Sequence, residues 1–287
     1  MNYDLHIHSC FSDGAFNPSE LVLMANKLGL TAIAIADHDS VAGVNEGIAC
    51  GEIQSVEVIP AVELSVQFEN WKDVHLLGYG IDHRDQTFLR QLNTFRDRRE
   101  KRNDEILSLV NNMLQDEDHA PIDIDEVLIY AQDAIGRPHI ARALLERGYV
   151  SNIEDAFRRY LVPCNVPKTY WPIEDAIAEI HRIKGAAVLA HPTSISKDRQ
   201  ELRRVISELK RIGLDGIEVF NNLAYEEEME FLRRLALELD LFITGGSDFH
   251  GIEDGLEMGK GRGGVRFSED LITPLKFLTA QRITANP

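Results

Sequence analysis

Short apolar runs alternate with helical patterns along most of this chain, and this alternation limits the folds that the chain can form. Seven runs have the length and continuous apolar character of buried strands: residues 3–7, 31–36, 56–62, 74–79, 186–190, 216–220 and 241–244. Helical patterns separate most of them. Strands that are apolar on both faces are typical of a parallel sheet covered by helices. The pattern therefore predicts an α/β fold, a barrel-like (β/α) arrangement with seven parallel strands, and the alternative is an open, doubly wound sheet.

One long helical stretch interrupts this alternation. Residues 96–114 have a helical pattern that opens with a basic stretch, and shorter helical patterns follow at 125–131, 139–147 and 153–160. No convincing strand pattern occurs between residues 96 and 168. We therefore expect a barrel domain formed by residues 1–95 and 169–287, and a helical insertion formed by residues 96–168 that shapes the substrate pocket.

Charge and composition exclude several classes of protein. The net charge of −17 disfavours general binding to duplex nucleic acid. No apolar run approaches the roughly 18 residues that a membrane span needs, and no basic-then-apolar leader opens the chain. The three cysteines, Cys10, Cys50 and Cys164, are unclustered and odd in number, which favours reduced thiols. We expect a cytoplasmic protein that does not associate with membranes.

Histidines and carboxylates occur where the predicted strands end. His38 and Glu63 closely follow two of these strands, and His6 and His8 alternate with apolar residues so that both point the same way. Taken alone, that pair could be two polar residues on an exposed strand. The remaining candidates lie in or after other strands, or in the loop 10–14: Asp13, His75, His191, Asp248 and His250. Because the carboxyl ends of parallel strands share one face, these side chains should converge. Mixed imidazole and carboxylate donors suit Zn, Fe and Mn, so the sequence predicts a multinuclear metal site.

The order of these residues resembles the pattern of the PHP (polymerase and histidinol phosphatase) family of metal-dependent phosphoesterases. The matching positions are His6-x-His8-Ser9, Asp13, Asp37-His38, Glu63, His75, His191-Pro192 and Ser247-Asp248-x-His250. The resemblance covers nearly the whole chain outside the insertion. It implies a distorted seven-stranded barrel with three divalent metal ions, Mn²⁺ first, with Zn²⁺ or Fe²⁺ as alternatives. It also implies three ligand sets: His6, His8, Glu63 and Asp248; Glu63, His75 and His191; and Asp13, His38 and His250.

Such a centre suits phosphate-ester hydrolysis. Clustered divalent ions lower the pKa of a bound water, and the resulting hydroxide attacks phosphorus in line with the leaving oxygen. The sequence contains no Gly-x-Ser-x-Gly elbow and no P-loop, which disfavours covalent hydrolases and NTPases. Asp248 and His250 are the candidates for the leaving-group acid. We expect Asp4, Asp37 and Asp39 either to orient the ligand histidines or to cap loops.

The insertion offers groups that could hold a substrate. Arg137 and His139 lie where a helix begins, beside Pro138, and a helix N-terminus is a natural anion site. Lys168 lies where the chain returns to the barrel, and Asn221 follows the strand at 216–220. We expect these four side chains to bind substrate.

With this insertion, the chain is similar to a PHP subgroup that removes a phosphate from nucleoside 3′,5′-bisphosphates such as pAp. Members of that subgroup are also similar to 5′→3′ exonucleases of short RNA. The resemblance therefore implies a small nucleotide or a short oligoribonucleotide as the substrate. Two alternatives stay open: a histidinol-phosphate or other small phosphomonoester phosphatase, and a non-catalytic metal-binding PHP module.

Overall fold

The computed structural model describes residues 2–129, 136–252, 255–268, 271–276, 278 and 280. The chain forms two compact units, one comprising residues 1–89 and 170–287 and the other residues 90–169. No helix among the described residues is both long enough and apolar enough to cross a membrane.

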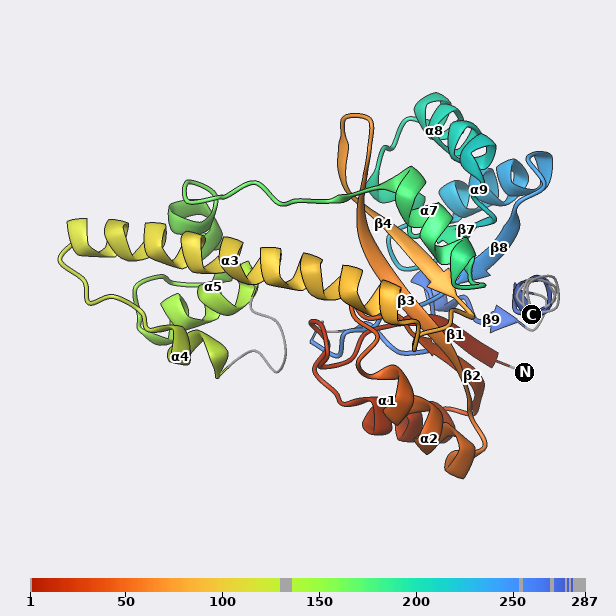
Figure 1. Ribbon diagram of the computed structural model, residues 1–287, viewed down its shortest axis with the longest axis horizontal. Helices are drawn as coiled ribbons and strands as arrows, with labels where there is room; N and C mark the ends of the chain where they lie inside the picture. The colour runs from red at the N-terminus through yellow and green to blue at the C-terminus, as the bar shows by residue number, and fades with distance from the viewer. Residues whose placement is uncertain are drawn as a thin grey trace. The chain divides into compact units, whose positions relative to one another are not determined.

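The first unit is built on one sheet (Figure 1). Among the described residues this sheet has nine strands, and its order is β8-β7-β6-β4-β3-β2-β1-β9, with β5 paired to β3. The strands are β1 (Asn2–Ile7), β2 (Leu30–Ile35), β3 (Glu57–Phe68), β4 (Trp71–Tyr79), β5 (Trp171–Pro172), β6 (Ala186–Leu189), β7 (Gly216–Phe220), β8 (Phe242–Gly245) and β9 (Phe267–Ser268). All seven expected strands are present, and β5 and β9 are short additions.

The sheet nearly closes into a barrel because the chain after β8 reaches β1. The Asp248 backbone N–H donates to the His6 carbonyl at 2.8 Å, and the His8 N–H donates to the Phe249 carbonyl at 2.9 Å. A parallel bridge also joins Ile7 to Phe249. This closure brings the first and last candidate ligands of the sequence together.

The expectation of seven parallel strands is wrong at β4, which runs antiparallel to both β3 and β6. The reason is a tight hairpin: Phe68 pairs with Trp71, so no crossover helix separates the two strands. Strand β3 is also longer than the expected run at 56–62, and Glu63 therefore lies within it, opposite Leu77. At the hairpin tip, the two terminal nitrogens of the Arg204 guanidinium, Nη1 and Nη2, donate to the carboxylate of Glu69.

Helices α1 (Pro18–Lys27), α2 (Val44–Gln54), α7 (Ile173–Arg182), α8 (Arg199–Ile212) and α9 (Glu226–Glu238) belong to the same unit, with short 3₁₀ turns η2 (Pro192–Ser194) and η3 (Arg262–Gly264). Helix α1 begins at a capping box, in which Asn17 and Glu20 each accept the other's backbone N–H. Helix α8 buries Leu202, Val205, Ile206 and Leu209, an apolar stripe at helical spacing. These buried faces let the helices cover the sheet.

The two faces of β2 lie in different parts of the core. Ala32 and Ala34 join a cluster that includes Leu77 and Tyr79 of β4, whereas Ile33 and its neighbours pack with helix α1. The buried Tyr79 hydroxyl donates to the Leu5 carbonyl at 2.8 Å and so ties β4 to β1. A core filled on both faces explains why these strands are almost continuously apolar.

The second unit has a hydrophobic core of its own. It contains most of α3 (Gln86–Asp116), together with α4 (Ile124–Leu128), α5 (Arg137–Glu146), α6 (Ile153–Ala156) and the π-helix η1 (Phe157–Leu161). No strand occurs in its described ranges, 90–129 and 136–169. The expected helix at 125–131 corresponds to α4, and its last two residues lie outside the described part of the chain. That an insertion at 96–168 shapes a substrate pocket stays a prediction.

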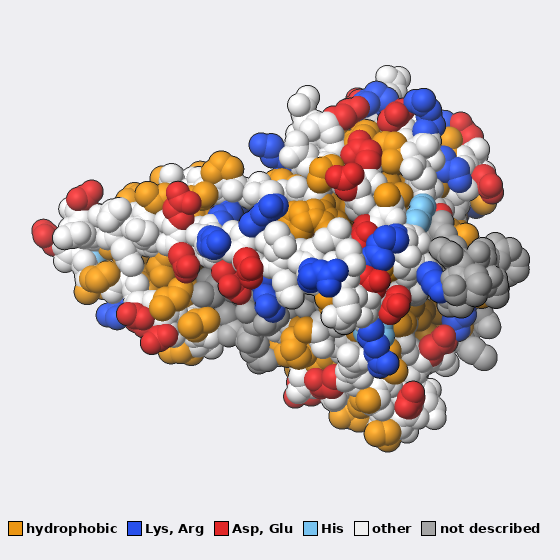
Figure 2. All heavy atoms as spheres, in the orientation of Figure 1, with side chains coloured by type: hydrophobic (Ala, Val, Ile, Leu, Met, Phe, Trp, Pro, Cys, Tyr) orange, Lys and Arg blue, Asp and Glu red, His pale blue; other side chains and the backbone are white. Residues whose placement is uncertain are grey.

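Charged side chains on the face drawn in Figure 2 are interspersed, with Lys and Arg beside Asp and Glu. Several arginines of the first unit contact two carboxylates each. Arg182 pairs with Asp85 and Glu179, and Arg204 pairs with Glu69 and Glu201. The Arg204–Glu69 pair is exposed, and exposed pairs contribute little to stability one by one, typically about 0–1 kcal/mol, whereas Glu179 is mostly buried.

Candidate metal centre

Nine imidazole and carboxylate side chains from distant parts of the sequence meet in the first unit. They come from β1 and the loop after it, from the chain after β2, from β3 and β4, and from the chain after β6 and after β8. They are His6, His8, Asp13, His38, Glu63, His75, His191, Asp248 and His250. Contacts of 3.6 Å or less between their ring nitrogens and carboxylate oxygens connect all nine. The expected convergence is therefore present.

Glu63 lies at the middle of this cluster and is wholly buried. Its Oε1 lies 3.3 Å from His6 Nε2, 3.0 Å from His75 Nδ1 and 3.2 Å from His191 Nε2. Its Oε2 faces a different pair, His8 Nε2 at 3.4 Å and His38 Nδ1 at 2.8 Å. A carboxylate whose two oxygens face two sets of donors has the geometry to bridge two cations.

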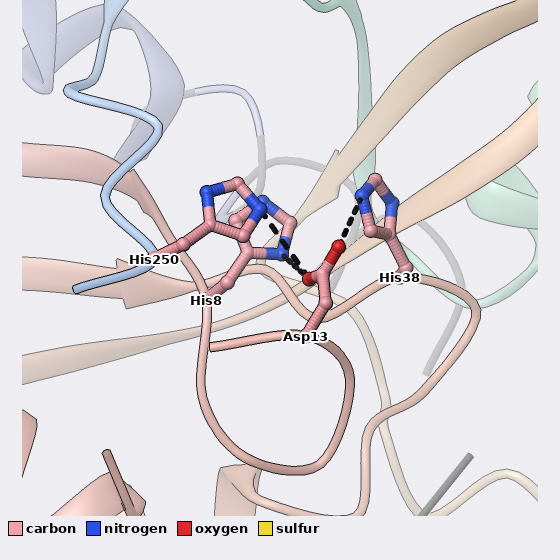
Figure 3. A group of neighbouring side chains, drawn as sticks. All are labelled: His8, Asp13, His38 and His250. Carbon is pink, nitrogen blue, oxygen red and sulfur yellow. Dashed lines mark ion pairs between the residues drawn. The ribbon is translucent and has the colours of Figure 1, made fainter. Parts of the chain in front are cut away.

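Asp13 lies between His38 and the rings of His8 and His250, as Figure 3 shows, and its side chain is more exposed than that of Glu63. Its Oδ1 lies 3.3 Å from His250 Nε2 and 3.6 Å from His8 Nδ1, and its Oδ2 lies 3.6 Å from His38 Nε2. The rings of His8 and His250 stack with centroids 4.2 Å apart. The His250 Nδ1 lies 2.9 Å from the Asp248 carbonyl, so it can donate there while Nε2 faces Asp13.

The donor atoms fit divalent cations. His38 Nδ1 and Glu63 Oε2 lie 2.8 Å apart, yet neither makes a hydrogen bond within the described part of the chain. Buried polar atoms without partners are costly, and cations bound in the cluster would satisfy both. Three groups have ligand atoms within 4.8 Å of one another: His8, Asp13, His38 and His250; His6, His8 and Asp248; and His38, Glu63 and His75. His8 and His38 each belong to two of these groups, whereas the family resemblance assigns each of them to one ligand set.

The electrostatics of the cluster favour anionic carboxylates. Burial alone would raise the pKa of Glu63 and Asp248, but the surrounding imidazoles hold the pKa of each carboxyl well below its usual range. Burial would likewise lower the pKa of His75, but Glu63 and Asp73 raise it to about 10. Cation binding at such a ring displaces its proton.

Two further aspartates hold the loops that carry these side chains. Asp4 accepts from the Ser247 N–H at 2.9 Å and the Gly259 N–H at 2.6 Å. Asp37 accepts from the Ser9 N–H at 2.7 Å and the Ser12 hydroxyl at 2.6 Å. Of the two roles expected for Asp4 and Asp37, these contacts correspond to loop capping. Asp39 accepts from the Ser65 N–H at 2.9 Å.

Glu218 is a site residue that the sequence analysis missed. It is wholly buried in β7, and its Oε1 lies 3.0 Å from His6 Nδ1. Its Oε2 accepts the backbone N–H of His191 at 2.9 Å. A lone carboxylate inside an otherwise apolar strand is unusual, and this feature of residues 216–220 could have identified it.

Three of the four expected substrate residues belong to the second unit. Arg137 is the first residue of α5, lies over the Phe157 ring and donates from Nη1 to Asn165 Oδ1 at 3.1 Å. His139 Nδ1 accepts the Gly136 N–H at 3.0 Å, and Lys168 is half-buried. Asn221, in the first unit, is wholly buried, and its amide oxygen accepts from the backbone N–H groups of Leu223 and Ala224. Substrate binding by these side chains stays a prediction.

A nearly closed α/β barrel with clustered imidazoles and carboxylates is typical of metal-dependent hydrolases, and comparisons with known proteins identify the family. Residues 4–213 match the family model for the PHP domain. A 5′-3′ exoribonuclease of Haemophilus influenzae is 33% identical over 261 residues, which cover 90% of this chain and 93% of that protein. A 3′,5′-nucleoside bisphosphate phosphatase of Chromobacterium violaceum is 30% identical over 280 residues, covering 94% and 92%.

A solved structure agrees with these relatives. A Bifidobacterium adolescentis protein, proposed to be a metal-dependent phosphoesterase, superposes with a TM-score of 0.82 at 29% identity, covering 96% of each chain. This chain therefore belongs to the PHP domain family. It is a metal-dependent phosphoesterase that uses divalent ions.

Proposed function

We propose that this protein hydrolyses a phosphate ester of nucleoside 3′,5′-bisphosphates such as pAp, or releases 5′-terminal nucleotides from short RNA. The observation that carries the proposal is the single cluster of nine imidazole and carboxylate side chains around the buried Glu63. The substrate class is taken from two similar proteins, whose names describe an exoribonuclease and a nucleoside bisphosphate phosphatase.

We propose three divalent ions, with Mn²⁺ as the first choice. One would be held by His6, His8, Glu63 and Asp248, a second by Glu63, His75 and His191, and a third by Asp13, His38 and His250. When bound, such ions supply an activated water and neutralise charge on the phosphate oxygens.

The protein's own groups determine how a substrate would approach. His6, His8 and Glu63 are wholly buried, whereas the side chain of Asp13 is 43% exposed and that of Asp248 is 24% exposed. A phosphate ester would therefore enter from the side of Asp13 and Asp248. His250 is partly exposed there, and we propose it as the group that protonates the leaving oxygen. Asp248 is less suited to this role, because the surrounding imidazoles hold the pKa of its carboxyl low and keep it ionised.

The second phosphate needs a separate cationic site, and we propose Arg137, His139 and Lys168 for it. Arg137 starts α5, and the N-terminal end of a helix favours anions. The guanidinium groups of Arg137 and Arg102 both donate to the neutral Asn165 amide oxygen, at 3.1 and 2.9 Å. The Arg137 guanidinium has N–H donors beyond this contact, and a phosphate accepts several charge-assisted hydrogen bonds.

Arg137→Ala should lower kcat/KM for a bisphosphate substrate about 10- to 100-fold. A hydrogen bond to a charged group contributes about 1.5–3 kcal/mol, and about 1.4 kcal/mol corresponds to a factor of ten in rate. Activity on a monophosphate that lacks the second phosphate should change little. Arg142→Ala is the matched control, because Arg142 lies on the same helix and pairs with Glu146. Equal effects of the two substitutions would exclude the role proposed for Arg137.

The proposed function is tested with a panel of substrates. Purified protein with Mn²⁺ should release phosphate from pAp or nucleotides from short 5′-phosphorylated RNA. Faster turnover of histidinol phosphate would favour the first alternative, although the similar proteins named above do not favour it. No release from any nucleotide or oligonucleotide, with several cations tried in turn, would reject the proposal and leave a non-catalytic metal-binding module.

A further inference from the structure

We propose that Glu218 is a positioning residue, which orients the ring of His6 and the backbone of His191 toward the same ion cluster. This inference rests on the metal ligands proposed above. Glu218 lies in β7, between β6 and β8, and the chain after β8 meets β1, which carries His6. One carboxylate therefore connects two candidate ligands that are far apart in the sequence, His6 in β1 and His191 after β6.

The contact with His6 determines which ring nitrogen faces the cluster. A carboxylate only accepts hydrogen bonds, so the His6 Nδ1, 3.0 Å from Glu218 Oε1, carries the ring proton. The lone pair is then on Nε2. This is the nitrogen that lies 3.3 Å from Glu63 Oε1 and 3.4 Å from Asp248 Oδ1. Without Glu218, either tautomer of His6 would be available, and one of them cannot bind a cation through Nε2.

The contact with His191 acts on the backbone. His191 has φ +26° and ψ +64°, a conformation that residues with a Cβ seldom adopt. Its N–H donates to Glu218 Oε2 at 2.9 Å, while its Nε2 lies 3.2 Å from Glu63 Oε1. The rings of His6 and His191 are nearly parallel, with centroids 5.9 Å apart. Glu218 thus fixes the spacing of two imidazoles that face the same oxygen of Glu63.

A role for Glu218 in stabilising the fold alone explains these contacts less well than a role in positioning the candidate ligands. Within the described part of the chain, the side-chain oxygens of Glu218 accept only from His6 and His191. A wholly buried carboxylate is expensive, and no lysine or arginine among the described residues pairs with it. An apolar side chain would avoid the cost of burying a charge, but it would leave His6 Nδ1 and the His191 N–H without this acceptor. A buried charge at this position is expected if Glu218 orients the candidate ligands that it contacts.

Glu218→Gln separates the two roles because it keeps the shape and removes one acceptor. The amide cannot accept from both the His6 Nδ1–H and the His191 N–H. Either two donors face each other at His191, or His6 adopts the wrong tautomer. The affinity for Mn²⁺, measured by calorimetry, should fall about 10- to 100-fold. The visible absorption of the Co²⁺-loaded variant should also change, because it reports the ligand geometry.

Glu179→Gln is the matched control. Glu179 is a mostly buried carboxylate on α7 that pairs with Arg182, outside the nine-residue cluster. It should leave the Mn²⁺ affinity and the Co²⁺ spectrum unchanged, even if it lowers stability. A Glu218→Gln variant with the wild-type affinity and spectrum would overturn the proposed role of Glu218. A wild-type protein that binds no divalent cation would instead reject the proposed ligands themselves.

A measurement on the wild-type protein tests the proposal even if the Glu218→Gln variant does not fold. Long-range ¹H–¹⁵N spectra of the Zn²⁺-loaded protein report which nitrogen of each histidine carries a proton. We expect the proton of His6 on Nδ1. A proton on Nε2 of His6 would contradict the proposal without any variant.

Discussion

Glu63→Gln should lower the rate of phosphate-ester hydrolysis about 1,000-fold or more. The substitution keeps the shape of the side chain and removes the charge that faces His6, His8, His38, His75 and His191. An amide cannot bridge two cations as a carboxylate does. Bound ions contribute several kcal/mol of transition-state stabilisation, and a loss of about 4 kcal/mol corresponds to about 1,000-fold in rate. The measurement is kcat/KM with Mn²⁺ present, together with the metal content of the variant.

Glu69→Gln is the control for this substitution. Glu69 lies at the tip of the β3–β4 hairpin, six positions along the chain from Glu63, and pairs with Arg204 on the surface. It should retain the wild-type rate and metal content. A Glu63→Gln variant with the wild-type rate would show that the cluster around Glu63 is not the catalytic centre.

Gly246→Ala should destabilise the fold by about 3 kcal/mol or more, near the upper end for an overpacked core. A Cβ at this position would lie 2.2 Å from the His6 Cβ and 2.6 Å from the His6 backbone nitrogen. The chain after β8 would have to move away from β1 and would lose the hydrogen bond from the Asp248 N–H to the His6 carbonyl. Both Asp248 and His6 would shift, so Mn²⁺ affinity should fall as well. Urea unfolding and calorimetry measure the two effects.

Gly29→Ala provides the comparison, because it strains the backbone without a clash. Gly29 has φ +70°, and a Cβ there would meet no described atom within 4 Å. The Gly29→Ala substitution should lower the free energy of unfolding by about 1–2 kcal/mol. The Mn²⁺ affinity of this variant should equal that of the wild type. A Gly246→Ala variant that is no less stable than Gly29→Ala and binds Mn²⁺ normally would show that the chain after β8 does not approach β1 this closely.

The apolar runs predicted the strands well, because burial on both faces imposes a continuous apolar pattern. Whether neighbouring strands run parallel or antiparallel was less predictable. The β3–β4 hairpin turns at residues 69–70, and the polar Gln67, Glu69 and Asp73 around it resemble a loop. As a result, Glu63 and His75 reach the cluster from within strands, not from strand ends. Their convergence was predicted from a topology that is only partly present.

The supporting contacts of the candidate site could not be predicted from spacing. Asp4 binds Ser247, and Glu218 contacts His6, although each pair is separated by more than 200 residues. Such pairs depend on how nearly the barrel closes, which no local pattern specifies. Residues with a strong local pattern, such as His6-x-His8 and Asp248-x-His250, were found because their spacing alone identifies them.

The central claim is that this cluster catalyses hydrolysis by holding divalent ions. The most direct test is phosphate release from pAp by protein stripped of metal with a chelator, followed by titration with Mn²⁺. We predict no release from the stripped protein and a rate that rises with added Mn²⁺ until the sites are filled. Full activity of protein shown to contain no divalent cation would contradict the account.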